Sequence, residues 1–468
     1  MGNKSKNDGE YTLPIPFFNR VTVNFMLTVG MVAAAMLVAF WASQAVAGEV
    51  PLVKPEAVGL SSERLQRIDR LINTVVPEKK IAGAVVLVAR KGKIAYLQAW
   101  GMADTGKPME KDTIFRVVSM TKPLTSTAIM LLYEEGKLLL SDPVSKYIPE
   151  FKNQKVLELL PEGSEFEYRL VPAKRAVTVR DLLTHTSGIL YLFPTNWSTD
   201  RKRILITDFY KEAGITDGFC RPDEEIGDMV RRLARLPLYG HPGEVWDYGL
   251  SSDVLGYLVE VVSGMKFDRF MAERIFAPLK MKDSHFYIPR EKLPRLAAVW
   301  LSDWQGSLTR ADDQPMISGD LALCPSDAYA LSGKYLAGGA SVLSTAYDYF
   351  RFAQMLLNKG ALDGVRLLSR KTVELMTGVN HIGDFDADFL HSKGWKFGLG
   401  FAIQQDRRHN VDSGDAGVFE WAGIYSTRFS INPREEQITI FLSQTSPFGL
   451  HFGLWDTLLV LSNSAIVD

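Results

Sequence analysis

A serine and a lysine three positions apart, Ser119 and Lys122, are the residues of this sequence best suited to covalent chemistry. On a helix they would share one face, with Cβ atoms about 5–6 Å apart. A serine hydroxyl becomes a strong nucleophile only when a neighbouring base removes its proton. Lysine can be that base if burial and a helix N-terminus lower the pKa of its amine. The alternative for these residues alone is a helix cap at Ser119 and a solvated lysine.

Three further stretches bear on whether Ser119 and Lys122 form a catalytic site. Residues 241–256 place Tyr248 on a Pro-Gly loop just before a helical pattern, and residues 182–188 read Leu-Leu-Thr-His-Thr-Ser-Gly. Residues 421–423, Trp-Ala-Gly, precede a strand-like run. Each alone has an ordinary structural interpretation, such as a buried tyrosine with one hydrogen bond or a core tryptophan. Their order along the chain is more informative than any one of them.

In this order the four stretches resemble the serine β-lactamase and penicillin-binding protein superfamily. Within it the chain is most similar to the class C β-lactamase-related esterases, called family VIII carboxylesterases. The resemblance covers about residues 55–447. It implies a β-lactamase/transpeptidase-like fold and a serine hydrolase that needs no cofactor.

The resemblance also implies a role for each matching residue. Ser119 is expected to be the acylated nucleophile and Lys122 the base that takes its proton. Tyr248 is expected to relay a proton to the leaving group and later to help activate water. The backbone N–H groups of Ser119 and Ile424 are expected to form the oxyanion hole, where each donor is worth about 10²–10³ in rate. Substrate contacts are expected from Trp421, Ala422, Gly423, Leu250 and Tyr191.

Two positions depart from the pattern of many β-lactamases. Leu250 stands where they carry an asparagine, two places after the tyrosine, and Trp421 stands where they carry a lysine. The first difference removes an amide that could bind a substrate amide. The second removes a cation that could bind a β-lactam carboxylate. Both differences favour apolar, uncharged acyl substrates, and therefore esters over antibiotics.

Other chemistries find less support in the sequence. His185 lies in the 182–188 run, which is structural in relatives, and a Ser-Lys-Tyr site needs no imidazole. The remaining histidines are scattered without a His-Glu-x-x-His motif, so no metal is expected. Gly-x-Ser-x-Gly, the nucleophile elbow of α/β-hydrolases, is absent. The aromatic residues between Tyr191 and Trp197 are explained as well by packing as by a substrate wall.

Hydrophobic periodicity predicts the elements that must hold these groups. Residues 82–89 and 94–100 are typical of a β-hairpin, and strand-like runs return at 397–404, 425–431 and 437–443. Helical patterns fill the middle of the chain. We therefore expect an α+β fold: one mainly antiparallel sheet from both chain ends, flanked by helices, with an inserted helical subdomain. The catalytic cleft is expected between the two parts.

These patterns predict a catalytic domain over residues 49–468. Its α/β part is expected at about 55–118 and 335–468, and its helical part at about 119–334. The charged residues 152–178 are expected to form an irregular surface insertion.

Residues 1–47 are predicted to be a signal peptide or an N-terminal membrane anchor. Basic residues precede an apolar centre at 25–42, and a small-x-small cleavage pattern follows at 45–47. The apolar centre is also just long enough to span a bilayer, so an uncleaved anchor is the alternative. In either case the protein is expected to be exported: periplasmic or secreted, or anchored to the membrane by residues 25–42.

The composition excludes some partners. The 468 residues are 46% hydrophobic and 23% charged with a net charge of -1, which is ordinary for a globular protein. A nucleic-acid-binding protein would need a basic face, so the expected partner is a small-molecule ester or amide. Membrane contact is expected only through the N-terminal segment. Cys220 and Cys324 are too few for a zinc site, and neither their pairing nor the oligomeric state is predicted.

Three functions remain open. The first is hydrolysis of short-chain carboxylic esters through an acyl-enzyme on Ser119. The second uses the same machinery on amides, as a β-lactamase or a D-amino-acid peptidase. The third is a membrane-anchored sensor or binding protein that is acylated without turnover. The apolar segment at 25–42 suggests this third function, but residues 1–20 are too short for a signalling domain.

Overall fold

The structure is a computed structural model. It describes residues 51–193, 198–217, 223–303, 307–311, 316–318, 321–323, 330–387, 394–405, 415–446 and 452–468. The predicted signal or anchor segment 1–47, Trp197, Cys220 and Cys324 lie outside these ranges. Within them no helix is long and apolar enough to cross a membrane. Residues 52–468 form one compact unit.

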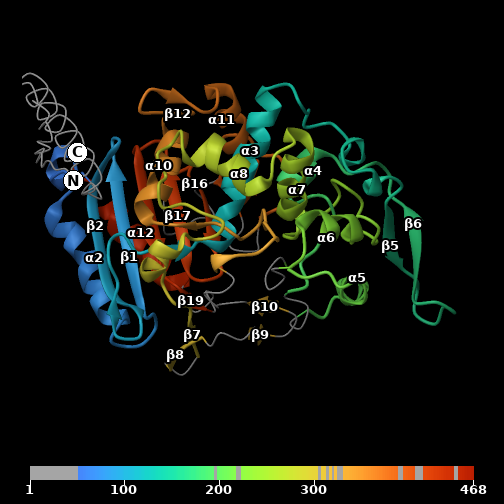
Figure 1. Cartoon of the computed structure of the whole chain (residues 1–468), viewed down its shortest axis with the longest axis horizontal. Coiled ribbons are helices and arrows are strands. Elements are labelled where there is room, and N and C mark those ends of the chain that lie inside the picture. The colour runs from blue at the N-terminus through green and yellow to red at the C-terminus, as the bar shows by residue number, and fades with distance from the viewer. Residues whose placement is uncertain are drawn as a thin grey trace, which may run out of the picture. The chain divides into compact units, whose positions relative to one another are not determined.

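An eight-stranded antiparallel sheet from both ends of the chain forms the centre of this unit (Figure 1). Its order is β14-β15-β16-β17-β18-β1-β2-β3. The early strands are β1 (Gly83–Arg90), β2 (Lys93–Asp104) and β3 (Lys107–Pro108). The late strands are β14 (Trp395–Phe397), β15 (Ala402–Gln404), β16 (Phe419–Gly423), β17 (Thr427–Asn432) and β18 (Gln437–Leu442). The predicted α+β fold with a sheet from both chain ends is confirmed.

The β1–β2 hairpin follows directly from its local sequence. Its two-residue loop is Lys91-Gly92, and both residues have positive φ, +51° and +74°. Two positive φ values make a type I′ turn, whose twist matches that of the flanking strands. Every residue of β1 is buried, because helices cover both faces of the sheet there.

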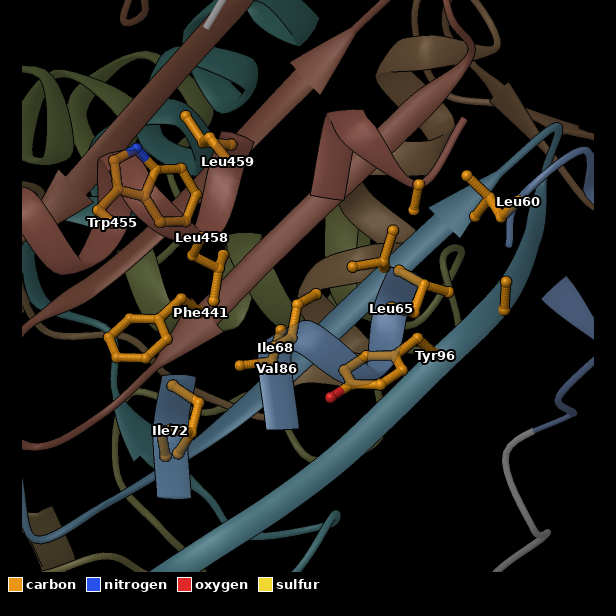
Figure 2. Close-up of a cluster of buried hydrophobic side chains, with 14 of the residues drawn as sticks. Leu60, Leu65, Ile68, Ile72, Val86, Tyr96, Phe441, Trp455, Leu458 and Leu459 are labelled. Atoms are coloured by element: carbon orange, nitrogen blue, oxygen red, sulfur yellow. The ribbon is translucent and has the colours of Figure 1, made fainter. Parts of the chain in front are cut away.

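Two terminal helices cover one face of the sheet: α2 (Ser62–Val75) and α12 (Phe452–Ser464). Ser61 caps α2 by accepting a hydrogen bond from the Arg64 backbone N–H at 3.3 Å. The apolar sides of the two helices meet the sheet in a core that Figure 2 shows, with Leu65, Ile68, Ile72, Val86, Tyr96, Phe441, Trp455, Leu458 and Leu459.

The opposite face carries α10 (Ala346–Leu357), where the Tyr349 and Phe429 rings lie 5.0 Å apart. The helical part surrounds α7 (Ser251–Ser263). This helix packs against α3 (Thr121–Glu134), α4 (Val179–Leu183), α6 (Ile226–Leu233) and α8 (Phe267–Met271). Among the described residues there are also helices α5 (Arg201–Glu212) and α11 (Arg370–Thr377) and a π-helical turn at Ala272–Phe276. Short 3-10 turns lie at Pro55–Val58, Val144–Lys146, Pro149–Phe151 and Arg290–Arg295.

Short strand pairs complete the chain. They are β4 (Phe115–Arg116) with β11 (Leu343–Ser344), β9 (Met316–Ser318) with β10 (Leu321–Leu323), β12 (Ala361–Leu362) with β13 (Val365–Arg366), and a three-stranded sheet of β19 (Thr445–Ser446), β7 (Trp300–Ser302) and β8 (Leu308–Arg310).

Two local predictions were wrong. Residues 152–178 are not irregular: they contain the hairpin of β5 (Lys155–Leu159) and β6 (Tyr168–Pro172), whose long arm is visible in Figure 1. Residues 397–404 are not one strand, because the chain turns between β14 and β15. Gly400 has φ +91° there, and a Cβ on it would lie 2.1 Å from Ser126 Oγ. Glycine at position 400 therefore allows the turn to pack directly against α3.

Candidate active site

Ser119 lies in a tight 3-10 turn, Val118–Met120, between β4 and α3. Val118 has φ +44°, a conformation that costs a β-branched residue energy and is found mainly at functional sites. The Gln444 side chain braces the turn, accepting from the Arg116 N–H and donating to the Arg116 carbonyl, each at 3.0 Å. Ser119 is partly exposed although its neighbours are buried, so its hydroxyl can meet a ligand.

Lys122 is the group closest to that hydroxyl. Its Nζ lies 3.0 Å from Ser119 Oγ and donates to the Gly339 carbonyl at 2.9 Å. The lysine is 1% exposed, and burial lowers its pKa from the ordinary 10.5 because the charged form loses its hydration. A buried lysine with a depressed pKa at this distance can accept a serine proton. The structure thus brings these two predicted residues together.

Tyr248 ends the loop before α7 and joins the same cluster. Burial raises the pKa of its hydroxyl, and the nearby side chains of Ser119 and Trp421 oppose this effect without outweighing it. Lys122 Nζ lies 4.6 Å from the centre of the Tyr248 ring. The ring also lies 5.3 Å from both the Trp421 and Tyr191 rings. Aromatic walls therefore surround the serine, the lysine and the tyrosine hydroxyl.

His185 supports the Tyr248 loop from behind. Its backbone carbonyl accepts the Asp247 N–H at 2.9 Å, and its Nδ1 accepts the Gly249 N–H at 3.4 Å. Burial lowers the pKa of the imidazole to about 3, so the ring is neutral and can accept at Nδ1. The two bonds hold the backbone on either side of Tyr248.

The end of β16 lies against the nucleophile turn. A Cβ on Gly423 would lie 2.5 Å from the Val117 carbonyl oxygen, and Thr427 Oγ1 donates to that oxygen at 3.1 Å. Ile424 follows directly and packs in one small cluster with Val118. The predicted oxyanion pair, the N–H groups of Ser119 and Ile424, therefore belongs to two segments in contact.

The predicted substrate contacts lie in three different surroundings. Trp421 and Tyr191 are buried in the aromatic cluster beside Tyr248. Leu250 is fully buried and its N–H donates to the Leu190 carbonyl at 3.4 Å. Ala422 alternates with Trp421 along β16, so its side chain lies on the other face of the sheet.

Sequence reasoning missed the groups behind Lys122. Gly339, Asp217 and Asp253 come from distant segments, and only Asp253, five residues after Tyr248, is near a recognised motif. Asp217 accepts the Leu192 and Phe193 N–H groups at 2.7 and 3.2 Å and so fixes the loop after Tyr191. No local pattern distinguishes these residues from ordinary loop and helix residues.

Comparisons with known proteins identify the family and relatives of this chain. The family model described as Beta-lactamase matches residues 68–461. Protein Rv1367c of Mycobacterium tuberculosis is 33% identical over 377 residues, 78% of this chain and 86% of that protein. Esterase EstB of Burkholderia gladioli is 30% identical over 406 residues, covering 85% and 94%. The structure of EstCE1, a hydrolase with promiscuous acyltransferase activity, superposes with a TM-score of 0.70 at 25% identity, covering 85% and 99%.

Fold, site and matches together define a serine hydrolase with the β-lactamase/transpeptidase fold. The chain belongs to the Beta-lactamase family. Its relatives include Esterase EstB and the Putative penicillin-binding protein PbpX of Bacillus subtilis, which is 29% identical over 329 residues, 69% of this chain and 66% of that protein.

Proposed function

We propose that this protein hydrolyses short-chain carboxylic esters through an acyl-enzyme on Ser119. The observation that carries the proposal is the 3.0 Å contact between Ser119 Oγ and the buried Lys122 Nζ. Lys122 takes the serine proton as the oxygen attacks the ester carbonyl. Tyr248 passes a proton to the leaving alcohol, and water then releases the acid. Backbone N–H groups of Ser119 and Ile424 bind the oxyanion.

An apolar site favours esters over charged or amide-rich substrates. Trp421 contributes an aromatic ring and Leu250 a buried aliphatic side chain where other members of the superfamily carry a cation and an amide. Burying a charged or amide-rich ligand group without such a partner is costly. The 30% identity with Esterase EstB also supports ester hydrolysis.

The test is intact-protein mass spectrometry during p-nitrophenyl butyrate hydrolysis. We expect a transient butyryl adduct that maps to Ser119, with many turnovers, and no turnover by folded Ser119→Ala. Hydrolysis that persists in folded Ser119→Ala would overturn the proposal. Rapid nitrocefin or D-Ala-D-Ala cleavage without esterase activity would favour the amide alternative. A stable adduct with no product would favour a sensor.

Acyl transfer to an alcohol is a second candidate. EstCE1 is described as having promiscuous acyltransferase activity, and a methylbutanoyltransferase of Aspergillus terreus is 28% identical over 311 residues. Transfer needs only that an alcohol replaces water in the second step. Adding short alcohols during p-nitrophenyl butyrate turnover should then yield butyrate esters, measurable by gas chromatography. Butyric acid as the only product would exclude transfer to these alcohols.

A further inference from the structure

Asp253 is a buried carboxyl group to which the catalytic scheme above gives no task. It lies in the first turn of α7 and is 1% exposed. Its Oδ1 accepts a hydrogen bond from the Tyr335 hydroxyl at 3.4 Å. Its Oδ2 is buried without a hydrogen-bond partner among the described residues. Leaving a buried carboxylate oxygen in this state is costly, so such groups are rare in native proteins unless they have a role.

The unpartnered oxygen points toward the space beside Gly339. A Cβ on Gly339 would lie 2.8 Å from Asp253 Oδ2, 2.9 Å from the Tyr191 hydroxyl and 3.3 Å from Lys122 Nζ. These three polar atoms, from α7, a loop and α3, therefore surround one point. Gly339 itself is fixed there, since its carbonyl accepts from Lys122 and the preceding Gly338 packs against the α7 backbone. A side chain at this position would separate the three groups.

Asp253 and Lys122 act on each other electrostatically. Burial lowers the pKa of Lys122 and raises the pKa of Asp253, while each group favours the charged form of the other. The other polar groups near the pair are Asp217, which also favours the ammonium, the neutral His185, and the hydroxyls of Tyr191, Tyr248 and Tyr335. Asp253 is the largest electrostatic influence that strengthens Lys122 as a base.

We propose that Asp253 is a positioning residue whose carboxylate stabilises the Lys122 ammonium formed during acylation. In that step the Ser119 O–H bond breaks, an N–H bond forms on Lys122, and the serine oxygen bonds to the acyl carbon. The ammonium then lies in a dry site, where a nearby negative charge replaces lost hydration. Without this charge, burial alone makes Lys122 too weak a base. The inference rests on the proposed function and deepens it.

The test is the pH dependence of kcat/KM for p-nitrophenyl butyrate in Asp253→Asn. Asparagine keeps the size of the side chain but removes the charge. An opposite charge at about 4–6 Å raises the pKa of a lysine by about one to three pH units, so removing it should lower the pKa of Lys122 by a similar amount. The acid limb of the profile, which is the pH range where kcat/KM falls because Lys122 becomes protonated, should therefore move to lower pH. The maximum value of kcat/KM, reached at pH values above the acid limb, should fall about tenfold or more, because a base of lower pKa accepts a proton less readily.

Asp348→Asn is the matched control. Asp348 is also a buried aspartate with a raised pKa in the first turn of a helix, but it accepts from the Asp283 N–H and Ser284 hydroxyl. Its substitution should lower stability and leave the acid limb in place. Asp253→Glu, which restores the charge, should return the limb toward the parent position. An acid limb that stays fixed or moves to higher pH in folded Asp253→Asn would overturn the proposal.

Gly339→Ala provides a second measurement that does not depend on the folding of Asp253→Asn. The three atoms nearest to the added methyl are the ends of side chains, so we expect the fold to tolerate it while Asp253 and Lys122 move apart. We expect a smaller limb shift in the same direction, and no shift would count against the proposal. Failure of the proposed function can be distinguished from failure of this inference by mass spectrometry of the parent protein. If the proposed function is wrong, Ser119 of the parent protein will carry no acyl group.

Discussion

Gly423 and Val118 are in direct contact across the junction of the sheet and the nucleophile turn. A Cβ on Gly423 would lie 2.6 Å from Val118 Cγ2. The strained Val118 precedes Ser119, and Gly423 precedes Ile424, so this contact sets the separation of the two N–H groups proposed for the oxyanion hole. Glycine is required here because the Val117 backbone and Val118 leave no space for a side chain.

Gly423→Ala should therefore impair catalysis more than stability. The methyl must push β16 away from the turn, and a misplacement of about 1 Å can cost about 10²-fold in rate. We expect kcat/KM for p-nitrophenyl butyrate to fall by that order while the protein stays folded. Gly453→Ala is the control, because a Cβ on Gly453 meets nothing within 4 Å. Unchanged kcat/KM in Gly423→Ala would show that the junction does not set the geometry.

His185→Ala should reduce activity moderately. The substitution removes the acceptor for the Gly249 N–H, which loosens the loop that carries Tyr248. We expect about a tenfold loss in kcat/KM, far below the 10⁴-fold typical of disrupting a catalytic triad. His185→Asn should recover part of it, because asparagine tolerates the positive φ of +57° at this position. A 10⁴-fold loss in folded His185→Ala would instead indicate that the imidazole takes part in proton transfer.

The rate at which a phosphonate inactivates the enzyme should rise with pH. Protonated Lys122 cannot take the Ser119 proton, so the rate falls as pH falls through the Lys122 pKa. Because burial lowers that pKa below 10.5, half-maximal reactivity should occur below pH 10.5. The same burial makes the unfolded chain bind a proton that the native state does not, so this group makes stability rise with pH between the two pKa values. Lys122→Arg, always charged, should react slowly at every pH.

Asp181→Ala should be destabilising. Asp181 is 4% exposed, and its carboxylate accepts from both Arg175 Nη groups, at 2.6 and 2.8 Å. It also accepts from the Thr178 N–H and hydroxyl in a capping box, and from the Thr186 hydroxyl. The side chain of Arg175 is 46% exposed and can be hydrated, so the main loss comes from the Thr178 and Thr186 donors left without an acceptor, which costs about 1–3 kcal/mol. Urea unfolding should show this loss, and Glu158→Ala, in an exposed pair with Arg169, should change the free energy of unfolding by less than about 1 kcal/mol.

The sequence predicted the parts of the site that have local signatures. The Ser-x-x-Lys spacing indicated Ser119 and Lys122. The order of this motif with the stretches around Tyr248 and Trp421 resembled the β-lactamase superfamily, and that resemblance suggested their roles. Asp253 was missed because an aspartate in the first turn of a helix is usually a solvated partner of the helix dipole. Only the packing of α7 against α3 and Gly339 buries it beside Lys122.

Long-range packing also explains the errors in the fold. Residues 397–404 are apolar enough to be predicted as one strand. The need for a turn at Gly400 becomes evident only from its contact with Ser126 on α3. The role of Gln444 could not be predicted either, because its side chain forms hydrogen bonds with the backbone of Arg116, 328 positions away in the sequence. Such contacts cannot be read from a window of neighbouring residues.

The pairing of β1 with β18 determines at which stage of its synthesis the chain can fold into an active enzyme. Val85 of β1 pairs with Leu442 of β18, so the sheet cannot be completed before β18 has been synthesised. Contacts this distant in sequence make folding slow. Strand β16, whose end abuts the nucleophile turn, reaches β1 only through β17 and β18. We therefore expect a ribosome-bound chain that has Ser119 and Lys122 but lacks β18 to be inactive, and the hydrolase to form only once β18 has emerged.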